Sequence, residues 1–112
     1  MLIMLSEDEN EIIADYILLP LVRKTLERDK KIIEESKVRF KEPYIMMIDK
    51  ALSQLAKDLN KVKREVYKQK IRFKKNHDLY YSVFVRGYEH NKKYHPYIAA
   101  DWVRKRIDTY LW

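Results

Sequence analysis

The residues best suited to bind a charged partner are basic side chains in the middle of the chain. Residues 61–76 contain eight Lys or Arg and one acidic residue, Glu65. The remaining residues balance to zero, so this segment accounts for the whole formal charge of +7. Such a density of cations is suited to phosphates, because each contact releases a counterion. The candidate contacts with phosphate or with an acidic partner are Lys61, Lys63, Arg64, Lys68, Lys70, Arg72, Lys74 and Lys75.

A basic cluster of this kind can also occur without any ligand. Lys and Arg are favoured at helix C-termini by the helix dipole, and a solvated basic face is common. The four acidic side chains among residues 7–11 are also able to complement the cluster, within one chain or across a dimer. Nucleic-acid binding by residues 61–76 is therefore one hypothesis. Tyr67 and Phe73 favour it as stacking platforms, but no short glycine-containing turn between two brief helices indicates a recognition helix.

Aromatic residues are concentrated in the second half of the chain, where eleven of the fourteen follow residue 66. Most have helical spacing and are expected in the core. Tyr80 and Tyr81 are adjacent and point in different directions, however, and Trp112 is the last residue. Tyr and Trp are frequent anchors of protein interfaces. We therefore predict a protein-binding surface whose candidate residues are Tyr67, Phe73, Tyr81, Tyr88, Trp102 and Trp112.

Catalytic and metal-binding patterns are weak. The chain has no cysteine, so it has no thiolate ligand or cysteine nucleophile. A glycine-rich phosphate-binding loop needs more than its single glycine, Gly87. His90 and His95 are five residues apart, a spacing that does not place them on one helical face, and no nearby carboxylate completes a metal set. We predict a non-enzymatic interaction or regulatory protein with no cofactor and no metal. It is expected to self-associate and to bind a protein partner through its aromatic and basic C-terminal half, with nucleic-acid binding by residues 61–76 as the alternative.

Composition favours helices, because three prolines and one glycine are too few for the turns of a sheet protein. A length of 112 residues fits one domain, residues 1–112. Ser6 and Glu9 have the spacing of a capping box, which predicts a first helix over about 6–35. Pro20 has no N–H and cannot donate the usual helical hydrogen bond to the Tyr16 carbonyl. This helix is therefore expected to be kinked or split near Leu19 and Pro20.

The strongest periodic signal lies between Ile45 and Val66, where aliphatic residues recur at steps of three and four. It predicts a long central helix over 43 to about 69, with Pro43 in its first turn and a connector at 36–42. The aliphatic seam is expected to pack on the first helix as a hairpin, or to be shared with a second copy. A helix of roughly 40 Å exceeds the width of a compact domain of this size, so we expect a homodimer.

A third helix is expected to begin at Asn76 or Asp78 and to include Leu79, Tyr80, Val83, Phe84 and Tyr88. Gly87 would then mark close packing or a helix end. Residues 70–76 and 90–95 are expected to be links. Pro96 opens a fourth helix. The fold class predicted is therefore all-α, a bundle of about four helices with a long central helix and a proline-kinked first helix.

No apolar stretch approaches the length of a membrane span, and the short apolar start lacks the pattern of an export signal, so a cytoplasmic protein is expected. The segments LSEDENEIIADYILLPLVRKTLERDKKIIEESKVRFKEPY and VFVRGYEHNKKYHPY resemble a group of small uncharacterised all-helical proteins of Bacillus-type bacteria and their prophages. The resemblance implies a cytoplasmic, phage-derived protein and transfers no functional residues.

Overall fold

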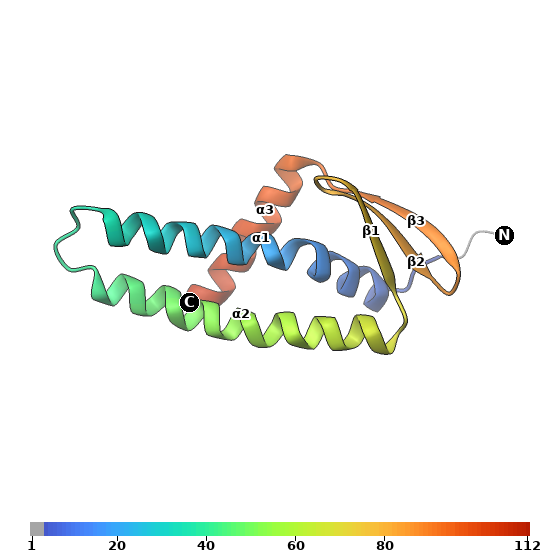
Figure 1. Ribbon diagram of the computed structural model, residues 1–112, viewed down its shortest axis with the longest axis horizontal. Coiled ribbons are helices and arrows are strands. Elements are labelled where there is room, and N and C mark those ends of the chain that lie inside the picture. Colours follow the sequence, from blue (N-terminus) through green and yellow to red (C-terminus); the bar gives the residue numbers. More distant parts are fainter. Residues whose placement is uncertain (1–3) are drawn as a thin grey trace.

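A computed structural model describes residues 4–112 and shows a helical hairpin, a small sheet and a crossing helix (Figure 1). The chain order is two long helices, three strands and a final helix. Their bounds are α1 Glu7–Glu35, α2 Glu42–Lys68, β1 Arg72–His77, β2 Tyr80–Val85, β3 Tyr88–Lys93 and α3 Pro96–Leu111. None of the helices in this part of the chain is sufficiently long and apolar to cross a membrane. Most of the short apolar start, residues 1–3, lies outside the described residues.

The first helix begins at the predicted capping box. The Ser6 hydroxyl oxygen accepts from the Glu9 N–H at 3.0 Å, and the Glu9 carboxylate accepts from the Ser6 N–H at 2.8 Å. Both bonds satisfy donors that a helix N-terminus otherwise leaves free. The helix then continues through Pro20 to Glu35 without being split, because its buried face packs along its whole middle.

The long central helix and the hairpin are confirmed. α2 spans Glu42–Lys68 with Pro43 in its first turn and runs antiparallel to α1. Aliphatic side chains from both helices form one core cluster, in which Leu19, Val22 and Leu26 of α1 meet Leu55 and Leu59 of α2. The predicted helix that begins at Pro96 is also confirmed. As α3 it crosses the hairpin and buries Val103 in the same cluster.

The predicted third helix is wrong, and so is the all-α fold class. Residues Tyr80–Val85 form the central strand of a three-stranded antiparallel sheet, so the fold is α+β. Val83 and Val85 alternate with Phe84 and are buried, as on one face of a strand. The same segment also fits a helical stripe, formed by Leu79, Tyr80, Val83 and Phe84. Aromatic and β-branched residues favour strands, however. Packing on the hairpin then selects the strand, in which every second side chain faces the core.

Gly87 occupies a tight turn, not a point of close helix packing. Arg86 and Gly87 are the two loop residues between β2 and β3, and their φ angles are 52° and 80°. Two consecutive positive φ values are typical of a type I′ turn, which matches the twist of a β-hairpin. A Cβ at Gly87 would meet nothing within 4 Å. Its role is therefore conformational.

Both segments predicted as links are edge strands of the sheet. Phe73 of β1 and His90 of β3 are the register partners of Val83, so these three residues share one face. This face packs on the N-terminal half of α1, where Ile13, Ile17 and Leu18 join Val83 and Val85 in a second core cluster. The basic segment 61–76 therefore passes from a helix into an edge strand.

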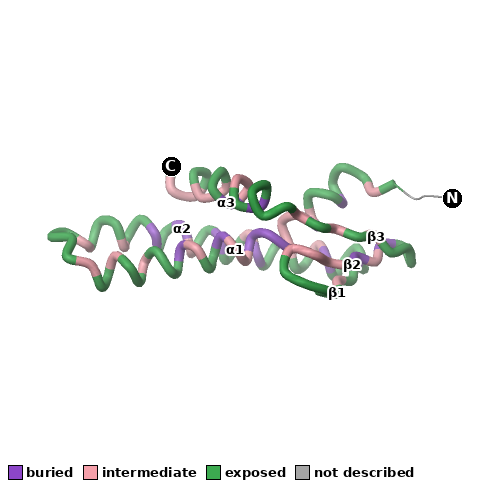
Figure 2. Tube along the Cα trace, turned by 90° about the horizontal axis from the view of Figure 1, so that it is seen from above, coloured by how far each residue is buried: buried purple, intermediate pink, exposed green. Residues whose placement is uncertain are grey.

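The molecule is elongated, with principal extents of 60 × 26 × 20 Å. The sheet lies beside one end of the α1–α2 hairpin, and α3 crosses the middle of the hairpin (Figure 1). The other end of the hairpin, with the turn between α1 and α2, projects beyond the sheet and α3 and is mostly exposed (Figure 2). The two ends of the hairpin therefore have different environments.

Candidate nucleic-acid interface

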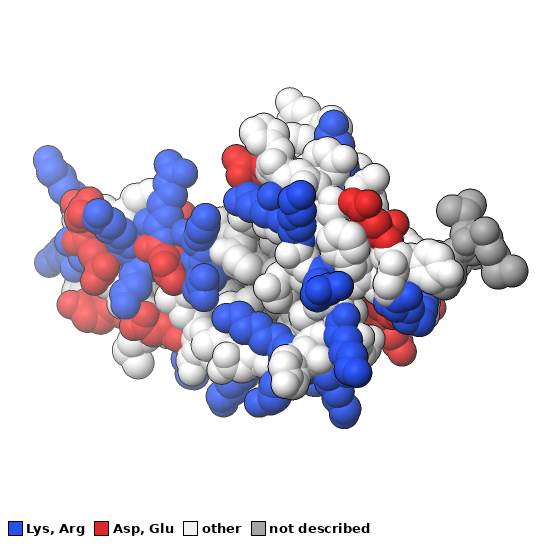
Figure 3. Space-filling view, turned by 45° about the vertical axis from the view of Figure 1, so that its right-hand side comes forward, with Lys and Arg blue, Asp and Glu red and all other residues white. Residues whose placement is uncertain are grey.

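The eight basic residues predicted as contacts are all exposed and form a continuous part of the chain. Four lie in the last turns of α2, Lys70 lies in the connecting turn, and three lie on β1. We call these residues the basic surface. Figure 3 shows Lys and Arg prevailing along the lower edge of the molecule, while acidic and basic side chains mix at the hairpin turn.

Few local acids neutralise the basic surface. Among its eight residues only Lys75 forms an ion pair in the described structure, with Asp78 at 3.3 Å. Both side chains are largely exposed, so this pair contributes little. The charges on β1 also have a structural use, because lysines on an edge strand discourage pairing with other sheets. That role does not explain the charges on α2.

A pocket of about 370 Å³ opens beside the basic surface, where α1, α2 and the sheet meet. It is large enough for a small ligand. Its lining comes from four elements that are distant in the sequence. The lining residues are Tyr16, Ile17, Pro20, Leu21, Lys24, Leu59, Val62, Lys63, Phe73, Lys75 and Tyr81.

Regular secondary structure explains why these side chains converge. Tyr16, Pro20 and Lys24 recur every four residues and so lie along one face of α1. Phe73 and Lys75 are two residues apart on β1 and therefore share its inner face. Tyr81 joins them because it is the register partner of Lys75.

Aromatic rings form one wall of this pocket. Tyr16 and Phe73 are stacked, with ring centroids 4.0 Å apart and planes inclined by 18°. Tyr81 also lines the pocket, and all three rings are partly buried. Aromatic rings held in this way accept a flat ligand with little loss of conformational freedom.

The polar part of the lining is positively charged. Lys24, Lys63 and Lys75 contribute three ammonium groups, and no acidic residue lines the pocket. Pro20 has no N–H, so the carbonyl of Tyr16 lacks its usual helical donor. Aromatic walls beside ammonium groups suit a planar, negatively charged ligand, which describes a nucleotide or one unit of a single-stranded nucleic acid. We call this site the base pocket.

The structure brings together Lys63, Phe73, Lys75 and Tyr81 of the predicted site residues. The sequence reasoning did not identify Tyr16, Pro20 and Lys24. Their spacing of four was visible, but on its own it indicates only a helix face. Nothing in the local sequence indicates that this face meets the basic segment.

The other predicted interface residues lie apart. Tyr67 at the end of α2 and Trp112 at the end of the chain are 87% and 86% exposed. Tyr88, at the β2–β3 turn, is 49% exposed. Trp102 is partly buried, with the Arg106 guanidinium 4.4 Å from the centre of its ring. Their roles as partner contacts stay predictions.

A cluster of titratable groups joins the three helices. Arg106 of α3 pairs with Asp15 of α1 at 2.9 Å, and the Tyr110 hydroxyl donates to Asp58 of α2. Burial raises the pKa of Asp15 above its ordinary value, and Arg106 offsets part of this effect. Burial and the bond to Asp58 likewise raise the pKa of Tyr110. These pairs satisfy one another, so their evident role is to fix α3 on the hairpin.

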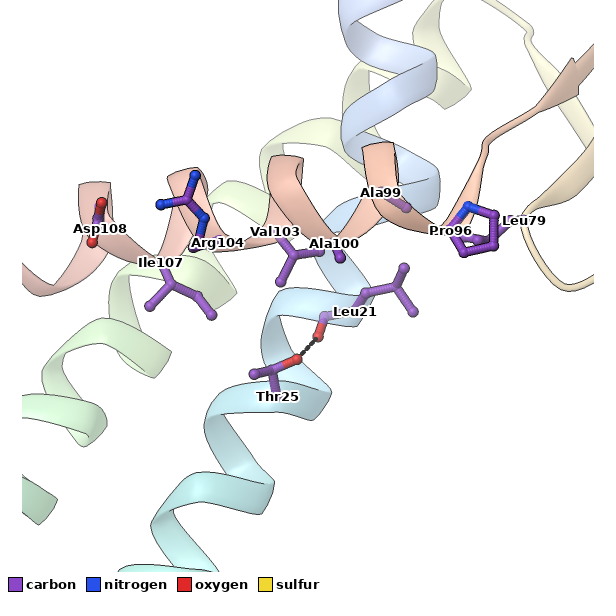
Figure 4. A pocket seen from close by; sticks show the side chains of 10 residues that line it. All are labelled: Leu21, Thr25, Leu79, Pro96, Ala99, Ala100, Val103, Arg104, Ile107 and Asp108. Carbon is purple, nitrogen blue, oxygen red and sulfur yellow. Dashed lines mark hydrogen bonds between the residues drawn. The ribbon is translucent and has the colours of Figure 1, made fainter.

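A larger groove of about 510 Å³ lies between α1 and α3 (Figure 4). Leu21, Val103 and Ile107 point toward it. The Thr25 hydroxyl does not offer its proton to a ligand, because it donates to the Leu21 carbonyl at 2.8 Å. This groove is mainly apolar. Across residues 4–112 there is also no group of three or more potential metal ligands.

The chain is similar to known proteins over nearly its whole length. The family model described as "YhjD protein" matches residues 4–112. The chain is also 30% identical over 111 residues to "Uncharacterized protein YhjD" of Bacillus subtilis (strain 168), which covers 96% of this chain and 92% of that protein. No solved structure matches. The resemblance to a Bacillus protein family is thus confirmed, although its all-helical part is wrong. The chain belongs to the YhjD family.

Proposed function

We propose that this protein binds single-stranded nucleic acid, with one base in the base pocket and neighbouring phosphates on the basic surface. The observation that supports the proposal is the lining of that pocket. Three aromatic rings and three lysines converge there from α1, α2 and the sheet, with no acid among them. A solvated basic face would not require aromatic rings in a concave site.

The proposal favours a single strand because a base must leave its stack to enter a pocket. Stacking of a base on an aromatic side chain contributes about 1–3 kcal/mol. In a duplex the bases are already paired and stacked, so only the phosphates would be available to this surface. No helix of the described fold is arranged as a recognition helix with a preceding short helix and turn.

The test is fluorescence anisotropy with a labelled short oligonucleotide, repeated over a range of salt concentrations. Lys63→Glu should weaken binding at least tenfold and reduce the salt slope, by about 0.7 for each phosphate that is no longer neutralised. Lys50→Glu is the matched control, since Lys50 is an exposed residue of the same helix outside the basic surface. It should change affinity much less.

Two results would contradict the proposal. One is the absence of binding at low ionic strength. The other is an equal loss of affinity in the Lys50 and Lys63 variants, which would show only attraction to the net charge. A duplex of the same sequence serves as competitor and should displace the single strand poorly.

Exposure of Tyr67, Tyr88 and Trp112 favours a second candidate function, a regulatory role in which a protein partner covers these side chains. Trp112→Ala should then weaken a partner complex and leave oligonucleotide affinity unchanged. A phage-derived origin also stays a prediction. Phage genes on both sides of the coding sequence would support it, and chromosomal metabolic genes on both sides would contradict it.

A further inference from the structure

The free end of the helical hairpin has an unusual concentration of exposed apolar side chains. Six of the twelve large hydrophobic residues that are exposed in the described structure fall within residues 32–47, with exposed fractions of 38–66%. We call them the end patch. They are Ile32, Val38, Phe40, Tyr44, Met46 and Met47. Of these six, Ile32, Tyr44 and Met47 line one common pocket, and exposed apolar surface shared in this way usually marks a contact site.

The end patch continues into a hollow. A pocket of about 320 Å³ includes Ile32, Tyr44 and Met47 in its lining and reaches Ile107 and Leu111 of α3. Ile107 also lines the α1–α3 groove. Apolar surface therefore extends from the facing ends of α1 and α2 to the crossing helix, and no segment of the described chain covers it.

The molecule exposes more surface than its mass requires. Its accessible surface is 8637 Å², about 2,000 Å² more than the roughly 6,600 Å² expected for a compact protein of 13.8 kDa. The radius of gyration of 16.3 Å likewise exceeds the approximately 13 Å expected for this length. A standard dimer buries about 800 Å² per copy. The excess is thus ample for one such interface.

Charge indicates which occupant fits. Residues 26–49 contain six basic and six acidic side chains, so this end of the hairpin can face an identical copy without net repulsion. The basic surface at the other end would repel itself. Lys30 and Asp49 already pair at 2.8 Å between α1 and α2, which illustrates how the two signs are mixed here.

We infer that a second copy of this chain covers the end patch. The contact is isologous, with the same patch on both copies related by a two-fold axis. The hairpin turns lie at the centre of such a dimer and the two sheets lie at its ends, so both base pockets stay open. This inference is independent of nucleic-acid binding.

The test is the molar mass in solution, measured by sedimentation equilibrium over a wide range of concentrations. The unmodified protein should approach twice the chain mass of 13.8 kDa. Ile32→Glu and Met47→Glu should each weaken the dimer at least tenfold. Ile98→Glu is the control, because Ile98 is 66% exposed on α3 and lines neither apolar pocket. It should leave the dimer intact.

A monomer at every concentration would overturn the inference, as would dimers unaffected by Ile32→Glu and Met47→Glu. An equal effect of Ile98→Glu would also overturn it. Helical circular dichroism verifies that each variant is folded. Oligonucleotide affinity should be unchanged in these variants, which separates failure of the dimer from failure of the base pocket.

The absence of cysteine allows a second measurement that perturbs no apolar contact at the core. A spin label at Lys37→Cys, an exposed position in the turn between α1 and α2 outside the end patch, should report a short distance between copies. A label at Tyr67→Cys, near the other end of α2, should report a much longer one. The reverse order of the two distances would contradict contact through the end patch.

Discussion

Tyr16 of α1 and Phe73 of β1 stack face to face, with their ring centroids 4.0 Å apart. The contact joins the sheet to the first helix and forms a wall of the base pocket. The same pair therefore serves the fold and the proposed site, so stability and oligonucleotide affinity have to be measured in the same variants to separate its two contributions.

The first prediction concerns this stack. Phe73→Leu retains much of the apolar contact but removes the ring, so it should reduce oligonucleotide affinity by about 1–3 kcal/mol, the contribution of one stacked base. A double-mutant cycle with Tyr16→Leu, followed by urea unfolding, should give a coupling of about 0.5–1.5 kcal/mol. Tyr88→Leu is an exposed aromatic control outside the pocket. Unchanged affinity in Phe73→Leu would remove the ring from the binding site.

The second prediction concerns Glu9, which connects two distant segments. Its carboxylate accepts from the Ser6 N–H and also pairs with Arg86 in the β2–β3 turn. The bond from the Ser6 backbone, assisted by Arg86, lowers the pKa of Glu9 below its ordinary value of 4.5, although burial opposes the shift. Because the folded pKa is the lower one, this stabilisation is present above about pH 4.5 and is lost as pH falls through the folded pKa.

Glu9→Gln keeps an oxygen that can accept from the Ser6 N–H but removes the charge. It should therefore destabilise the fold by about 0.3–1 kcal/mol at neutral pH and make its stability less sensitive to acidification. Urea unfolding at neutral and acid pH measures both effects. Glu7→Gln, at an exposed position in the same first turn, is the control and should reproduce neither. An unchanged pH dependence in Glu9→Gln would exclude this carboxylate as its source.

The third prediction concerns the type I′ turn. Gly87 has a φ of +80° and open space around its missing Cβ, so a substitution there costs conformational energy without a clash. Gly87→Val should lower the free energy of unfolding by more than about 1 kcal/mol, and Gly87→Asn by less, because Asn tolerates positive φ. Thermal unfolding compares the two. Equal effects would show that side-chain size, not φ, matters at this position.

Local sequence was sufficient for the three helices. Each helix has a signal that depends only on residues within a few turns. These signals are the capping box at Ser6, the steps of three and four from Ile45 to Val66, and Pro96 at a helix start. These signals also predicted the hairpin. The basic segment was equally visible, since charge is a property of composition.

Only tertiary structure decided the sheet and the base pocket. Residues 79–88 satisfy a period of two as well as a helical period, and strand pairing supplies the hydrogen bonds that resolve this ambiguity. Lys24 reaches Lys63 and Lys75 only because the hairpin folds back and the sheet closes over α1. Short-range periodicity contains no information about these long-range contacts. Side chains dozens of residues apart are brought together by burial of apolar surface across the whole chain.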